Sequence, residues 1–151
     1  MLDKVLICTD GSEEAQKAVL FASRLLSGSS CRAVLLMVLE NEVFYPPAAT
    51  DGILYPEVML PPPQELEEAL EERARGILAK AGEALRENGL EAEIKTVRGS
   101  AAREIIKEAE EGSYDLVIMG RHGHGLLKGF LIGSVSDRVV RHAPCPVLVV
   151  H

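Results

Sequence analysis

Short apolar runs alternate along the chain with segments whose apolar residues recur every three or four positions. Four runs are almost continuously apolar, and each predicts a strand buried on both faces: residues 4–9, 32–39, 115–119 and 146–150. Residues 91–97 instead alternate between polar and apolar positions, a pattern that is typical of an edge strand.

Helical spacing fills the intervals between these strands. The first predicted helix begins after Ser12, a favourable N-cap, with Glu13 and Glu14 in its first turn, and it ends by Gly28. Three more helices are expected, at residues 64 to about 88, after residues 99–100, and from residue 131 or 134 to 142. Strands and helices in strict alternation predict a parallel sheet with helices on both sides, a doubly wound α/β fold.

Residues 41–63 interrupt this alternation with clustered prolines, including the run Pro61-Pro62-Pro63. Proline excludes a long regular helix or central strand here. A long segment of this kind within a compact domain is typically a lid, a binding loop or an insertion. The whole chain, residues 1–151, is otherwise predicted to form a single domain.

Composition and charge narrow the classes of function. The net charge of −7 argues against a general nucleic-acid surface or an anionic-membrane surface, because both need a basic face. The apolar runs are far shorter than the roughly 20 residues that a membrane-spanning helix needs. The three cysteines form no CxxC pair, and the chain begins directly with a strand pattern. Buried thiols and a cytoplasmic location are therefore expected.

Topology points to one edge of the predicted sheet as the ligand site. Open α/β sheets bind ligands beyond the carboxyl ends of their strands, where the strand order reverses. If the first strand is central, the residues that meet there are Thr9, Asp10 and Gly11 after the first strand and residues 119–123 after the fourth.

Glycines in this region follow a regular spacing. Gly120 and Gly123 are followed, after nine intervening residues, by Gly133 and Ser134, which open the last helix. Glycine allows close approach or a positive φ, and a helix N-terminus favours an anion. Ser134 and Ser136 add hydroxyl groups, while Arg121 and Lys128 add positive charge. A plain strand–helix connection is the alternative, but the combined spacing favours a phosphate site. The P-loop and GxGxxG motifs do not occur.

Two other functions use the same residues. Asp10, His122 and His124 are the candidates for a slow ATPase or phosphotransfer enzyme, which would need a group to orient the attacking water. The run His122-Gly123-His124 lacks a further ligand at metal-site spacing, so we assign no catalytic residue. The remaining alternative is a partner-binding module whose site is empty or holds only phosphate, and the intact glycine motif argues against it.

Taken together, these motifs resemble the universal stress protein family in its ATP-binding branch. The resemblance covers the whole chain, from Asp10-Gly11-Ser12-Glu13-Glu14-Ala15 to the ending at residues 143–150. The family's ATP motif G-x2-G-x9-G-[ST] is matched by Gly120, Gly123, Gly133 and Ser134. Met37 replaces a frequent histidine, and Ala101 stands where many members have proline.

The resemblance implies an adenine-nucleotide alpha-hydrolase-like fold with strand order 3-2-1-4-5, paired as a homodimer through the last strand, Val147 to Val150. It implies ATP as the ligand, with Mg²⁺ or Mn²⁺ as candidate metals. Adenine would lie at Val38, Asp10 beside the ribose or the metal-bound phosphates, and the glycines and serines around the phosphates. The full set of predicted ligand-binding residues comprises Thr9, Asp10, Val38, Met119, Gly120, Arg121, His122, Gly123, Gly133, Ser134, Val135 and Ser136.

Overall fold

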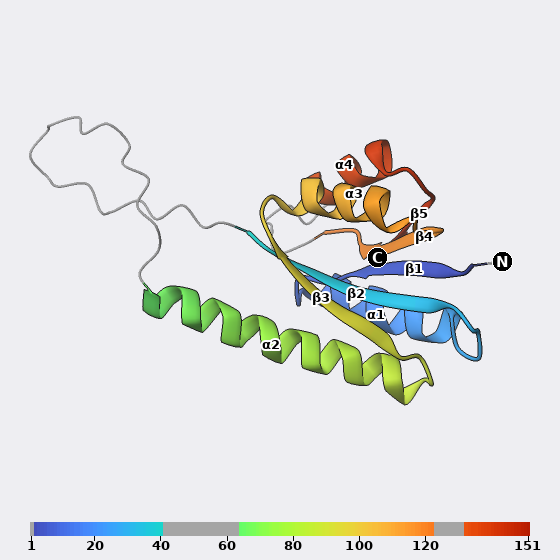
Figure 1. Cartoon of the computed structure of the whole chain (residues 1–151), viewed down its shortest axis with the longest axis horizontal. Coiled ribbons are helices and arrows are strands. Elements are labelled where there is room, and N and C mark those ends of the chain that lie inside the picture. Colours follow the sequence, from blue (N-terminus) through green and yellow to red (C-terminus); the bar gives the residue numbers. More distant parts are fainter. Residues whose placement is uncertain (1, 41–63, 123–131) are drawn as a thin grey trace, which may run out of the picture.

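A five-stranded parallel sheet lies between two pairs of helices in the computed structural model, which describes residues 2–40, 64–122 and 132–151 (Figure 1). The strand order is β3-β2-β1-β4-β5, as predicted. The strands are β1 (Lys4–Cys8), β2 (Arg32–Leu39), β3 (Ala92–Arg98), β4 (Leu116–Gly120) and β5 (Val147–Val150), and the helices are α1 (Glu13–Leu25), α2 (Gln64–Glu87), α3 (Ala101–Gly112) and α4 (Ser134–His142).

The predicted elements are all present, with small differences at their ends. The last helix begins at Ser134, the later of the two predicted starts. β1 ends at Cys8, one residue before the prediction, although the Thr9 amide still donates to the Leu36 carbonyl at 2.9 Å. Among the described strands, β3 pairs with β2 alone and lies at the edge of the sheet, as its alternating pattern predicted. The proline-rich segment 41–63 lies outside the described residues.

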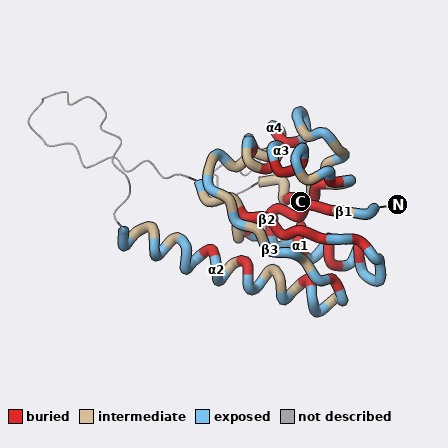
Figure 2. The backbone as a smooth tube through the Cα atoms, viewed as in Figure 1, coloured by how far each residue is buried: buried red, intermediate tan, exposed pale blue. Residues whose placement is uncertain are grey.

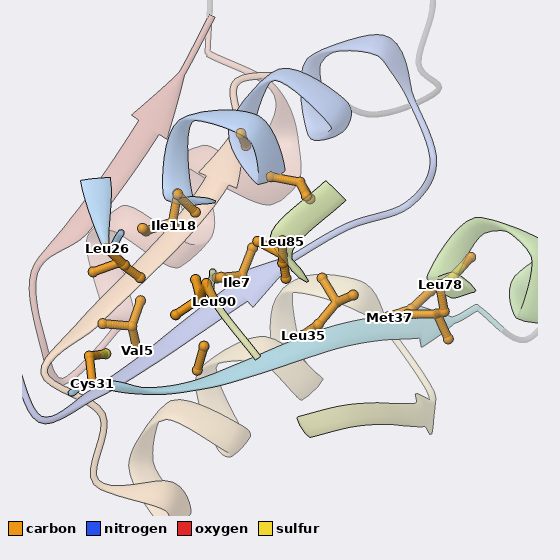
Figure 3. Packing of buried hydrophobic residues seen from close by; sticks show 14 of the residues in the cluster. Val5, Ile7, Leu26, Cys31, Leu35, Met37, Leu78, Leu85, Leu90 and Ile118 are labelled. Atoms are coloured by element: carbon orange, nitrogen blue, oxygen red, sulfur yellow. The ribbon is translucent and has the colours of Figure 1, made fainter. Parts of the chain in front are cut away.

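The two faces of the sheet bury separate apolar clusters. Successive strand residues point to opposite faces of the sheet. Val5 and Ile7 therefore enter the first apolar cluster, which lies beneath α1 and α2, while Leu6 and Cys8 enter the second apolar cluster, which lies beneath α3. Figure 2 shows the buried residues concentrated along the central strands, and Figure 3 shows the first cluster from close by. Both faces of β1 are therefore covered, which explains why its sequence is continuously apolar.

Both departures from the resembled family have a structural context. Met37 is buried in the first cluster, where a long apolar side chain fits. The backbone N–H of Ala101 donates to Oε1 of Glu40 at 3.2 Å. Proline has no backbone N–H, so it could not make this hydrogen bond between the end of β2 and the start of α3.

Cys8 and Cys31 are buried, Cys145 is half-buried, and all three are free. Burial raises the pKa of the Cys8 thiol, with a further contribution from the negative charge of Glu108. Within the described ranges, no helix combines the length and the apolar character needed to cross a membrane.

A carboxylate on α3 ties the edge strand to the second cluster. Glu108 is 9% exposed; its Oε2 accepts from Lys95 Nζ at 2.6 Å and its Oε1 accepts from the Tyr114 hydroxyl at 2.8 Å. Burial opposes ionisation of Glu108, but the hydrogen bonds from Lys95 and Tyr114 and the nearby positive charges outweigh it. The pKa of Glu108 therefore lies below its ordinary value of 4.5.

Replacing Glu108 by alanine should destabilise the fold, because the buried Tyr114 hydroxyl would lose its acceptor. We expect Glu108→Ala to lower the free energy of unfolding by about 1–3 kcal/mol in urea denaturation at pH 7. The folded-state pKa is depressed, so this stabilisation is present above pH 4.5 and is lost as the pH falls through the folded value. Glu110→Ala, on the exposed side of the same helix, is the control. Equal unfolding midpoints for the two variants would contradict the prediction.

Candidate functional site

The residues predicted to bind a ligand follow neighbouring parallel strands. β1 pairs with β2 on one side and with β4 on the other, so the carboxyl ends of all three strands meet at one edge of the sheet. Thr9 and Asp10 follow β1, Val38 lies near the end of β2, and Arg121 and His122 follow β4. The edge that topology selected is therefore the edge where these residues lie.

The turn after β1 is fixed by its own side chains. Oδ1 of Asp10 accepts from the Ser12 amide at 2.9 Å, and Oγ1 of Thr9 accepts from the Gly11 amide at 3.2 Å. Gly11 has a φ of +81°, and an added Cβ would lie 2.5 Å from Cδ1 of Ile77 on α2. Glycine is thus required here both for the backbone conformation and for the close approach of α2. Asp10 is held in place by this turn.

The start of α4 is joined directly to the end of β4. Gly133 is the N-cap of α4, and its amide donates to the Arg121 carbonyl at 2.9 Å. The Ser136 hydroxyl donates to the same carbonyl at 2.5 Å and lies 3.1 Å from the Gly133 carbonyl. The two described ends of the glycine motif are therefore in contact, although most of the sequence between them lies outside the described residues.

The two serines of the motif differ in their surroundings. Ser134 is exposed at the first position of α4, where a hydroxyl can reach a ligand. Ser136 is only 2% exposed and gives its hydroxyl proton to the protein backbone. In this arrangement the Ser136 hydroxyl is not available to donate to a ligand, because a hydroxyl has a single proton to donate.

Gly120 and Gly133 have a packing role that the sequence did not reveal. An added Cβ on Gly120 would lie 2.8 Å from the Ala15 nitrogen and the Glu14 carbonyl carbon, and one on Gly133 would lie 2.8 Å from the Arg121 oxygen. Neither glycine has a positive φ. The close approach of the backbone explains both residues, and the conformational freedom considered from the sequence is not used at either.

Glu14 belongs to this edge and was missed from the sequence, where it was interpreted only as a favourable charge at a helix N-terminus. Its Oε2 accepts from the His122 amide at 2.8 Å, and its Oε1 lies 3.7 Å from the Arg121 guanidinium. Nδ1 of His122 lies 3.3 Å from both Oε2 of Glu14 and Nε of Arg121. Burial would raise the pKa of Glu14, but these donors and charges outweigh it and hold the pKa below its ordinary value. No spacing in the sequence predicts this contact, because residues 14 and 122 meet only after folding.

Two further predicted residues at this edge direct their side chains toward the protein interior. Met119 is buried, with its side chain in the second apolar cluster. Val38 is half-buried and packs against the same cluster. Gly123, His124 and Lys128 lie outside the described residues, so their predicted roles stay predictions.

A cavity of about 430 Å³ lies beside this edge, between α2 and the ends of β2 and β3. Leu39, Leu78, Thr96 and Arg98 are among its lining residues. Arg98 Nη2 is hydrogen-bonded to Oε1 of Glu71 across it at 2.6 Å. The cavity includes none of the predicted ligand-binding residues, so it does not define the candidate site.

Comparisons with known proteins agree with the motif and the fold. A sequence model of the universal stress protein family matches residues 1–151. Universal stress protein YxiE of Bacillus subtilis is 31% identical over 150 residues, which are 99% of each chain. Universal stress protein MJ0577 of Methanocaldococcus jannaschii is 30% identical over 156 residues, with 99% of this chain and 95% of the relative covered.

Solved structures show the same architecture. The structure of MJ0577 superposes with a TM-score of 0.77 at 27% identity, covering 99% of this chain and 96% of the other. The universal stress protein UspA of Lactobacillus plantarum gives a TM-score of 0.80 at 22% identity, covering 99% and 98%. The family and the strand order inferred from the sequence are both confirmed.

The close contact at Gly120 can be tested with a single methyl group. Gly120→Ala should destabilise the fold by about 1–3 kcal/mol, because the new Cβ would clash with backbone atoms of α1. Backbone atoms within a helix cannot shift unless the whole helix shifts. Gly76→Ala on α2 is the control, since a Cβ there meets nothing within 4 Å. The control should be neutral or stabilising by up to about 1 kcal/mol, as alanine is the better helix former. Chemical denaturation of both variants measures these changes. A Gly120→Ala variant that unfolds at the wild-type midpoint would contradict the prediction.

Proposed function

The chain belongs to the universal stress protein family, and we propose that it is a regulatory protein that binds ATP at the carboxyl ends of β1, β2 and β4 and the N-terminus of α4. Nucleotide binding would alter a surface of the protein, and a partner or a second copy of the chain would bind to that surface during a stress response in the cytoplasm.

The observation that carries the proposal is the contact between the two ends of the glycine motif. The Gly133 amide donates to the carbonyl of Arg121, the residue after Gly120, so the first turn of α4 begins beside the end of β4. The N-cap of α4 is a glycine, which offers no side-chain acceptor to the first backbone N–H groups of the helix. These N–H groups and the positive end of the helix dipole favour a phosphate.

The adenine part of the proposal has separate support. Neighbours with the same fold include a universal stress protein in complex with cAMP, one from Archaeoglobus fulgidus in complex with dAMP and one from Arabidopsis thaliana with AMP bound. Their identities to this chain are 22%, 18% and 16%, so the likeness is one of fold. They supply the ligand class to test, while ATP is proposed from the glycine motif.

A divalent metal would accompany the phosphates. Asp10 offers a carboxylate at this edge, the kind of oxygen ligand that Mg²⁺ or Mn²⁺ accepts. In the part of the chain that the structure describes, no cluster of three or more His, Cys, Asp or Glu residues could hold a metal ion. We propose that oxygens of the nucleotide phosphates and of water complete the coordination.

We favour binding over catalysis because the two candidate catalytic groups that the structure describes, Asp10 and His122, make contacts within the fold; the third, His124, lies outside the described residues. Asp10 accepts from the Ser12 amide, and His122 lies against Glu14 and Arg121. A slow ATPase is the alternative at the same site. It would show turnover that Asp10→Ala abolishes while leaving nucleotide binding intact.

Nucleotide binding is tested by thermal unfolding. ATP with Mg²⁺ at 100 times its Kd should stabilise the protein by about 2.7 kcal/mol, which raises the Tm by roughly 5–10 °C. ADP and AMP should give smaller shifts at equal concentration, and GTP should give less than ATP.

Ser134→Asp is the decisive variant for the phosphate site. Aspartate is well tolerated in the first turn of a helix, so the fold should remain, but its charge would repel the phosphates at the start of α4. Ser100→Asp, at the N-cap of α3, makes the same change of charge at another helix start. The ATP shift should be lost in the first variant and kept in the second. No shift with any nucleotide in the wild type would refute the proposal.

We also propose a homodimer that pairs through β5. β5 is the sheet edge opposite β3, and its four residues are half-buried and apolar. The Pro146 carbonyl accepts from the Val117 amide, and the Val150 carbonyl accepts from the Arg121 amide. Backbone groups of successive strand residues point to opposite sides, so those of Val147 and Val149 point to the open edge of the sheet.

Val149→Pro should therefore separate the dimer without unfolding the protomer. Proline removes an outward-facing N–H and leaves the bonds between β4 and β5 intact. Light scattering at micromolar concentration should give a dimer mass for the wild type and a monomer mass for the variant, with circular dichroism unchanged. A wild-type monomer under these conditions would contradict the proposal.

A further inference from the structure

One peptide group at the candidate site is held from two sides. The group that joins Arg121 to His122 consists of the Arg121 carbonyl and the His122 N–H, which point in opposite directions in a trans peptide. The carbonyl accepts from the Gly133 amide and the Ser136 hydroxyl, both at the start of α4. The N–H donates to Oε2 of Glu14 in the first turn of α1.

Glu14 is suited to hold this peptide group in one orientation. Its side chain is 22% exposed, and the side chains of Arg121 and His122 beside it are 29% and 14% exposed. A charged acceptor makes a stronger hydrogen bond to an amide than a neutral one does. Gly120 lies on the same side, where a Cβ added to it would come within 2.8 Å of the backbone of Glu14 and Ala15.

Glu13 shows that the helix dipole does not account for this arrangement. It lies in the same first turn of α1, where a carboxylate is equally favoured by the dipole. Its side chain is 86% exposed and pairs with Lys17 at 3.5 Å, one turn along the same helix. Of the two adjacent carboxylates, Glu14 is the one that reaches the end of β4.

We propose that Glu14 is a positioning residue for nucleotide phosphates: it fixes the Arg121–His122 peptide group from the side of α1, so that the Arg121 carbonyl keeps the first turn of α4 in its binding position. This inference rests on the proposed nucleotide-binding function. Without Glu14 the peptide group is held only from the side of α4, so its orientation and the position of the first turn of α4 are less tightly fixed.

The sign of the effect separates positioning from simple electrostatics. A carboxylate near the bound phosphates repels them, so removing it should tighten ATP binding if its charge were all that mattered. Positioning predicts the opposite result. Loss of Glu14 should weaken the binding of ATP and leave adenosine, which has no phosphate, nearly unaffected.

The test is calorimetric titration of wild type, Glu14→Ala, Glu14→Gln and Glu13→Ala with ATP–Mg²⁺ and with adenosine. Glu14→Ala should raise the Kd for ATP by about tenfold, the size of effect that follows from losing one charge-assisted hydrogen bond. Glu14→Gln keeps an oxygen acceptor for the His122 amide and should recover part of this loss. Glu13→Ala should bind ATP as tightly as the wild type does, or slightly more tightly.

The outcomes distinguish the inference from the function on which it rests. If the wild type binds no nucleotide, the proposed function fails and the inference fails with it. If the wild type binds ATP and Glu14→Ala binds it equally well or more tightly, only the role of Glu14 is overturned. An equal loss for ATP and adenosine would also overturn it, because it would indicate general damage to the fold.

Discussion

The contact between α1, the end of β4 and the start of α4 is the constraint on which the candidate site depends. α1 approaches β4 so closely that position 120 has no room for a Cβ, and α4 approaches the next residue so closely that position 133 has none either. Between them lies the Arg121–His122 peptide group, with its oxygen bonded to α4 and its N–H bonded to Glu14. The backbone of three elements is thereby fixed within a few residues.

This constraint gives Gly120 and Gly133 a role in packing that does not depend on a ligand. Glycines at a phosphate site are usually explained by the ligand, which needs to approach the backbone. In this protein, Gly120 and Gly133 are already required by the packing of protein against protein. Packing within the protein therefore fixes the N-terminus of α4 without a ligand. Such preorganisation reduces the entropy that a protein loses when it binds a ligand.

The remainder of the fold supports this edge from both faces of the sheet. α1 and α2 cover one face of the sheet. Ile77 of α2 lies against Gly11, so α2 packs against the turn that holds Asp10. On the other face, Glu108 links β3 to the second apolar cluster through Lys95 and Tyr114. The candidate site thus lies above two apolar clusters, and Ser134 is exposed beside it.

The sequence by itself determined the strands, the helices, the parallel sheet and the residues that follow each strand, because apolar periodicity and turn residues are local signals. Its motifs taken together, from the first strand to the last, also resembled the family that the comparisons confirm. Only the tertiary structure decided that Glu14 meets His122, that the Ser136 hydroxyl bonds to the Arg121 carbonyl, and that close packing explains Gly120. These contacts join residues up to 108 positions apart, and such a distance is bridged by the crossover of helices over the sheet. No local sequence pattern predicts which side chains will then lie close enough to form a hydrogen bond with each other.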